Sequence, residues 1–129
     1  MAGETNLAWM LASLDVERRD GSFTFVTGDH PSLGGHAVAT IVEAEGMTTV
    51  VDVDVARAAG LAVDFEAAWL TLTVASALEA VGLTAAFSSA LADAGIACNV
   101  LAGFHHDHLL VPIDRVDEAV AVLRSLSDA

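Results

Sequence analysis

The densest group of side chains that could do chemistry lies at His105–His108, which reads His-His-Asp-His. Side chains alternate along a strand, so His106 and His108 would share one face there. Such a His-x-His pair can bind zinc, but a zinc site needs a third protein ligand. His30 and His36 lie in a separate glycine-rich segment, and nothing in the sequence places either beside the pair. We therefore predict no metal site and interpret the cluster as a polar turn that orients ligand or dimer contacts.

The sequence offers no group of residues that is typical of an enzyme active site. Ser88 and Ser89 fall inside a predicted helix, away from any evident base and outside the strand–turn setting of a nucleophilic serine. Asp29, His30 and Ser32 are neighbours in sequence, but a catalytic triad is defined by its geometry in space. We therefore predict a protein that is not an enzyme, with no catalytic residue and no cofactor.

The charge balance argues against several classes of partner. Eighteen acidic residues against five arginines, with no lysine, give a net charge of −13 over 129 residues. Such a surface repels the phosphates of nucleic acids and of anionic membranes, so we predict binding to neither. No stretch reaches the roughly 20 apolar residues that cross a bilayer, and no basic N-terminal region indicates a signal peptide. The single Cys98 excludes an internal disulfide and suits a reducing compartment, so the expected location is the cytoplasm.

Hydrophobic periodicity over residues 67–129 predicts the element order β-α-β-β-α, because alternating apolar residues indicate strands and a spacing of three or four indicates helices. Gly95 is placed to end the first helix, Gly103-Phe104 to join two strands, and Asp114 to cap the last helix. The expected elements are strands at Trp69–Ala75, Ile96–Ala102 and His105–Pro112, a helix at Leu83–Ala94, and a last helix after Asp114 whose apolar side runs from Val116 to Ser127. An antiparallel sheet with two helices on one face places this half in the α+β class.

Residues 1–66 predict the order α-β-β-β-α. Glu45-Gly46 is a hairpin signal, and Gly60 is placed to end a helix. The charged segment Asp15–Ser22 and the glycine-rich segment Gly28–Gly35 are interpreted as loops. The expected elements are a helix at Asn6–Leu14, strands at Ser22–Val26, Ala37–Glu43 and Met47–Asp52, and a helix at Val53–Ala59. We place the boundary between two domains, 1–66 and 67–129, in the connector Leu61–Ala67.

The segment Ala77–Pro112 resembles the second half of tandem ACT-domain proteins, a group that includes the cytosolic arginine sensors of animals. The features that carry this resemblance are Val81-Gly82-Leu83, Ala94-Gly95-Ile96 and Phe104–His108. In the first half, Phe23–Val26 and Ile41–Thr48 look like the ACT-like unit that precedes the ACT domain in small bacterial proteins. The resemblance implies two ferredoxin-like (ACT) halves, each with an antiparallel sheet and helices on one face. It also implies a non-catalytic regulatory module that binds an amino acid.

A ligand site is expected where the loop after the first strand of the second half enters the helix. The helical N–H groups near Val81, Gly82 and Leu83 have no intrahelical acceptor and lie at the positive end of the helix dipole, so they fit a carboxylate. Backbone carbonyls of the turn before Asp107, where the resemblance places ligand contacts, could accept from an α-amino group. The candidate ligand-binding residues are Glu79, Val81, Gly82, Leu83, Asn99, Ala102, Gly103, Phe104, His105 and Asp107. A plain strand–helix turn with water on these donors fits the same residues.

The assembly and two rival functions follow from the same features. The open edges of ferredoxin-like sheets pair readily, and the chain is 54% hydrophobic, so we expect a homodimer. One rival is a structural interaction module in which the ligand site is vestigial. The other is a His-rich metal-binding protein that uses His106 and His108.

Overall fold

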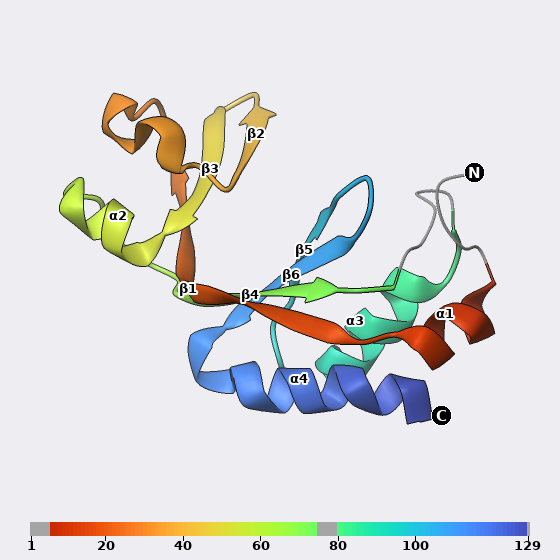
Figure 1. Ribbon diagram of the computed structural model, residues 1–129. Helices are drawn as coiled ribbons and strands as arrows, with labels where there is room; N and C mark the ends of the chain where they lie inside the picture. Colours follow the sequence, from red (N-terminus) through yellow and green to blue (C-terminus); the bar gives the residue numbers. More distant parts are fainter. Residues whose placement is uncertain (1–5, 75–79, 129) are drawn as a thin grey trace. The chain divides into compact units, whose positions relative to one another are not determined.

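The chain forms two packing units that are linked through one long strand, β1 (Val16–Thr27). In the computed structural model the described residues are 6–74 and 80–128 (Figure 1). The terminal unit comprises Met1–Arg19 and Ala68–Ala129, and the central unit comprises Asp20–Ala67. The first residues of β1 therefore belong to the terminal unit and the others to the central unit.

From β4 (Ala67–Leu72) to α4 (Val116–Ser125) the chain has the predicted β-α-β-β-α order. Strands β4, β6 (Asp107–Pro112) and β5 (Asn99–Ala102) follow the beginning of β1 in the sheet order β1-β4-β6-β5. β5 and β6 are antiparallel, with Ala102 opposite Asp107. The helices are α1 (Leu7–Ser13), α3 (Leu83–Asp93) and α4, and short 3₁₀ helices η2 (Ile113–Arg115) and η3 (Leu126–Asp128) flank α4. The predicted α+β class is confirmed.

One face of the terminal sheet is covered by the helices. Strand β4 contributes every second residue to this core, because residues two apart share a face of a strand, whereas α3 and α4 contribute residues three or four apart. The buried core residues are Met10, Leu14, Val16, Ala68, Leu70, Leu72, Val74, Leu83, Phe87, Leu91, Ile96, Leu109, Val111, Val116, Ala119 and Leu123. The side chains of Trp69 and Thr71 lie on the opposite face of β4, where they contact the candidate ligand site described below.

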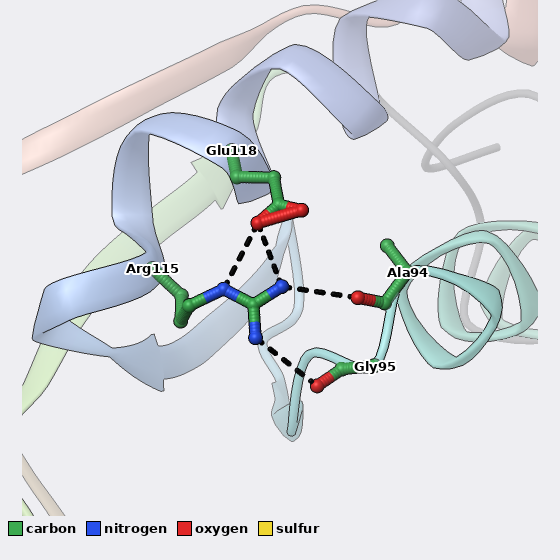
Figure 2. Close-up of polar contacts among 4 residues, drawn as sticks. All are labelled: Ala94, Gly95, Arg115 and Glu118. Carbon is green, nitrogen blue, oxygen red and sulfur yellow. Dashed lines mark hydrogen bonds and ion pairs between the residues drawn. The ribbon is translucent and has the colours of Figure 1, made fainter.

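Arg115 joins the end of α3 to the beginning of α4 (Figure 2). Its guanidinium donates to the carbonyl oxygens of Ala94, at 3.0 Å, and Gly95, at 3.4 Å, and to Glu118 Oε1 at 2.6 Å. A cation is favourable there because the last carbonyls of a helix carry partial negative charge. Gly95 has a φ of 72°, the left-handed value that ends a helix, as the sequence predicts. This contact holds the C-terminal end of α3 against α4.

The central unit consists of the remainder of β1, the 3₁₀ helix η1 (Pro31–His36), strands β2 (Ala39–Glu43) and β3 (Gly46–Asp52), and helix α2 (Val53–Ala58). Within it the strand order is β2-β3-β1, and both pairs are antiparallel. A two-residue turn at positions 44–45 joins β2 to β3, which confirms the predicted hairpin within one residue. One cluster of its buried residues consists of Val26, Leu33, Val51 and Ala56.

Apart from Asp15, the charged segment Asp15–Ser22 lies in strand β1, and the predicted loop is wrong. At the beginning of β1 the Asp15 carbonyl accepts a hydrogen bond from the Thr73 N–H at 2.9 Å. Further along, residues 23–27 pair with residues 48–52 of β3. The side chains of residues 17–21 are exposed, so their charges stay solvated while the backbone is extended. Strand formation here follows from tertiary backbone pairing, which overrides the local side-chain preference.

Three smaller predictions also need correction. Asp114 does not cap α4, because it lies inside η2 and the cap position is Arg115, which makes no side-chain capping bond. The segment Gly28–Gly35 includes most of η1, although Gly34 interrupts its helical geometry. Strand β6 begins only at Asp107, so His105 and His106 lie in the preceding turn and the predicted alternation across the histidine cluster is wrong.

The first testable prediction concerns Thr24 in the central unit. Its side chain is fully buried, and its Oγ1 has no hydrogen-bond partner within the described residues. An unpaired buried hydroxyl costs about 1–3 kcal/mol of desolvation. We expect Thr24→Val, which replaces the hydroxyl with a methyl group of similar size, to raise the free energy of unfolding by about 1 kcal/mol in urea titrations. Thr71→Val is the matched control, because the Thr71 hydroxyl is hydrogen-bonded and its removal should destabilise the protein. A Thr24→Val protein no more stable than wild type would contradict the prediction.

Candidate ligand site

The N-terminal end of α3 lies at a left-handed glycine. Gly82 occupies the N-cap position with φ 101° and ψ −20°, and no side chain of the described residues caps the helix there. Glycine is required because other residues rarely adopt this backbone conformation. Without a side-chain acceptor, the first N–H groups of this 11-residue helix are available to a ligand or to water.

The space beside Gly82 is taken by α1. A Cβ atom added at Gly82 would lie 2.9 Å from Leu7 Cδ2, so the glycine also permits close approach of the two helices. This contact could not be predicted from the sequence, because α1 and α3 are far apart along the chain. Leu83 is 3% exposed and belongs to the core, so it can offer a ligand only its backbone. Val81 is 81% exposed and Glu79 lies outside the described residues.

The turn between β5 and β6 is closed by its own backbone. The Gly103 N–H donates to the His106 carbonyl oxygen at 2.9 Å. A Cβ atom at Gly103 would lie 2.9 Å from that oxygen, so the turn needs a glycine at this position. Phe104 is 61% exposed, and its ring meets the His105 ring edge-on at 5.0 Å between centroids. The turn therefore presents an aromatic pair to solvent.

Polar side chains tie β6 to β4 on the sheet face that the helices leave uncovered. His108 Nδ1 and Thr71 Oγ1 are 2.9 Å apart in a hydrogen bond, and Thr71 Oγ1 accepts a second bond from Trp69 Nε1 at 3.3 Å. The His108 ring lies 5.2 Å from the Trp69 ring, and the Arg19 guanidinium lies 5.6 Å from the Trp69 ring centroid. The sequence pattern made His108 a candidate metal ligand in one rival hypothesis but gave no sign of its contacts with Thr71 and Trp69.

The pKa values of Asp107 and His108 differ from their ordinary values. Burial raises the pKa of Asp107, and the nearby His108 and His106 act in the opposite direction. Burial lowers the pKa of His108 from its ordinary value of 6.5; the charges of His106 and Arg19 also lower it, and Asp107 opposes them. A neutral His108 suits its hydrogen bond with Thr71.

Two of the predicted site segments leave the same end of the terminal sheet. Thr71 is near the end of β4 and His108 near the beginning of β6, so their hydrogen bond holds these strand ends together. The loop to α3 follows the first, and the turn at Ala102–Asp107 precedes the second. No hydrogen bond in the described ranges joins Val81–Leu83 directly to this turn. Asn99 is separated from the turn by the length of β5, about 10 Å at the rise of a strand.

Other chemistry finds little support in the described residues. Within residues 6–74 and 80–128, no three His, Cys, Asp or Glu side chains converge to hold a metal ion. Burial raises the pKa of the Cys98 thiol, which disfavours the reactive thiolate. None of the helices in this part of the chain is long and apolar enough to span a bilayer.

The second testable prediction uses the pKa of His108, which is depressed in the folded protein. The folded state then binds this proton less readily than the unfolded chain, so the free energy of unfolding should fall as the pH drops below about 6.5. His108→Gln can keep a hydrogen bond to Thr71 but does not titrate. Urea unfolding between pH 7.5 and 5.5 should therefore show a steeper loss for wild type than for the variant. Parallel profiles for the two proteins would contradict the assignment.

Comparisons with known proteins agree with this architecture. Residues 2–68 match one ACT domain family and residues 64–125 match another. A search of curated protein sequences finds no match. A crystal structure from Vibrio cholerae, of a protein of unknown function described as a possible transport protein, is 38% identical, with a TM-score of 0.84 over 94% of this chain and 95% of the other.

More distant structures share the fold. The ligand-free regulatory subunit of aspartate kinase from Thermus thermophilus is 14% identical, with a TM-score of 0.64 over 86% of this chain and 95% of that one. A protein from Agobacterium tumefaciens is 17% identical, with a TM-score of 0.61 over 88% and 89% of the two chains. With family matches that together run from residue 2 to residue 125, this chain belongs to the ACT domain family.

Proposed function

We propose that this protein is a non-catalytic regulatory module that binds an amino acid at the β4–α3 end of the terminal unit. The observation that carries the proposal is the Thr71–His108 hydrogen bond, which holds the ends of β4 and β6 together. The loop that leads to α3 and the turn Ala102–Asp107 both leave from that point. Membership of the ACT domain family supports a regulatory, ligand-binding role in general.

The two segments offer complementary groups to a zwitterion. The uncapped N–H groups at the beginning of α3 can donate to a carboxylate, which the helix dipole also favours. Carbonyl oxygens of the turn, together with the Asp107 carboxylate, can accept from an ammonium group. Burial raises the pKa of Asp107, so its charged form is disfavoured in the free protein and an adjacent ammonium would offset that penalty.

Within this proposal the predicted residues have unequal roles. Gly82 and Leu83 contribute backbone N–H groups, whereas Gly103, Phe104 and His105 shape the turn. Asn99 lies too far along β5 to join a ligand at the turn, so we leave it out of the proposed contacts. A ligand bound here can act as a regulator only through a difference in its affinity for two states of the protein or of its assembly.

The third testable prediction is direct binding of at least one of the twenty amino acids. Calorimetry and thermal-shift assays on the full chain should detect it, and Asp107→Asn should weaken it by about tenfold or more, because one charge-assisted bond is lost. Asp114→Asn is the matched control, since Asp114 is exposed and lies in η2, outside both site segments. If no amino acid gives heat or a thermal shift, the proposed function is wrong.

We further propose a homodimer formed along the edge strand β2, which also favours the rival role of an interaction module. All residues of β2 after Ala39 are exposed, with Ile41 at 42% and Val42 at 86%. Antiparallel pairing of two copies centred on Ile41 would place Val42 opposite Thr40 and Glu43 opposite Ala39. No like charges then meet, and the unpaired backbone groups of the edge gain partners.

The fourth testable prediction follows from that edge. Val42→Lys puts a charge at the centre of the pairing surface, so it should shift the protein toward monomer in analytical ultracentrifugation. Ala92→Lys is the control, since Ala92 is an exposed position on α3 and should leave the association unchanged. A wild-type protein that is monomeric, or a dimer that survives Val42→Lys, would exclude β2 as the interface.

A further inference from the structure

A groove of about 550 Å³ lies between the beginning of β1 and helix α4, within the terminal unit. This volume falls in the range of small-molecule sites, about 300–1,000 Å³. It involves none of the residues of the proposed amino-acid site above. The lining residues are Val16, Arg18, Val116, Asp117, Val120, Ala121 and Arg124.

The groove follows from the periodicity of its two walls. Asp117, Val120, Ala121 and Arg124 are spaced three, one and three residues apart, so they form one stripe on α4. Val16 and Arg18 are two apart and share a face of β1. The floor is apolar, since Val16 and Val116 are only 5% and 6% exposed.

One end of the groove is fixed by an internal ion pair. Arg124 Nε donates to Asp15 Oδ1 at 2.9 Å, and another nitrogen of its guanidinium donates to the Val16 carbonyl oxygen at 3.2 Å. These bonds hold α4 against the beginning of β1 and place the Arg124 charge beside a carboxylate of its own chain. Arg124 is therefore a structural cation, and the groove's binding chemistry depends on the remaining charges.

Arg18 and Asp117 line the same groove. Within the part of the chain that the structure describes, neither makes a side-chain hydrogen bond or an ion pair, and the two do not pair with each other. An arginine without an acidic partner is notable in a chain that carries 18 acids and five arginines. The groove thus presents one free cation, one free anion and an apolar floor.

We propose that this groove binds a small zwitterion with an apolar side chain, of the size of leucine. Arg18 would hold the carboxylate, Asp117 the ammonium group, and Val116, Val120 and Ala121 the side chain. A free anion is disfavoured because the net charge of −13 repels it, whereas a zwitterion carries no net charge. A free cation would meet Arg18, which is unpaired among the described residues, on the groove wall. This site is separate from the proposed site at α3, and either can exist without the other.

The test uses three probes that share the isobutyl side chain, with the whole chain: L-leucine, 4-methylpentanoate, which lacks the ammonium group, and 3-methylbutylamine, which lacks the carboxylate. L-leucine should shift the backbone amide NMR signals of residues 16–18 and 116–124. Both analogues should bind at least about tenfold more weakly, since each loses one charge-assisted contact. Arg18→Gln and Asp117→Asn should each weaken leucine binding by a similar factor.

Two variants locate the binding. Arg57→Gln removes an exposed arginine from the central unit and should leave leucine affinity unchanged, and Asp107→Asn should also leave the groove signals unchanged. Absence of leucine shifts at residues 16–18 and 116–124, equal binding of 4-methylpentanoate, or insensitivity to Arg18→Gln would each overturn the proposal. Shifts confined to the turn before Asp107 would overturn the groove while supporting the proposed function.

Discussion

The hydrogen bond between Thr71 and His108 is the contact on which the proposed site depends. It joins two strands that are 37 residues apart in sequence, at the end of the sheet from which both site segments leave. Trp69 reinforces it from the same strand face, through its own bond to Thr71 and its ring contact with His108. The turn that follows β5 is therefore anchored to β4 by side chains, in addition to the backbone of the sheet. A polar network of this kind is effective because each member satisfies another in a partly buried setting.

The scarcity of cations makes the arginines informative. Arg57 pairs with Glu66, Arg115 holds the end of α3, and Arg124 binds Asp15 and the beginning of β1. In the two terminal-unit cases the guanidinium also donates to a backbone carbonyl, so its loss would leave acceptors without a partner. In this strongly acidic chain, these bonds supply donors to backbone carbonyl oxygens that accept from Arg115 and Arg124. Most of the carboxylates remain exposed to water. Arg18 departs from this pattern, which is why the groove at α4 stands out.

Elements with a strong local pattern could be predicted from the sequence. The helix over Leu83–Asp93, the hairpin between β2 and β3, and the glycines that end α2 and α3 all follow from spacing and backbone preference. The first part of β1, at residues 16–22, could not, because its charged side chains are solvated and only its pairing with distant segments makes it extended. The width of the β5–β6 turn was missed for a similar reason. It depends on the Gly103–His106 backbone bond and on where His108 meets Thr71.

Gly82 shows how the same residue can carry a local and a long-range requirement. Its left-handed backbone explains the glycine at the beginning of α3. Only the free N–H groups of the helix near Gly82 are predicted from the sequence. The contact of Gly82 with Leu7 is not, because it depends on α1 folding back onto the terminal unit. Within the proposed function, a carboxylate on the first N–H groups of α3 would lie beside Leu7. Ligand binding and the packing of α1 would then compete for, or share, one small volume. A ligand that fits beside Leu7 would favour the docked position of α1, and a bulkier one would oppose it. Within the proposed function, ligand binding at this site would therefore change the position of α1.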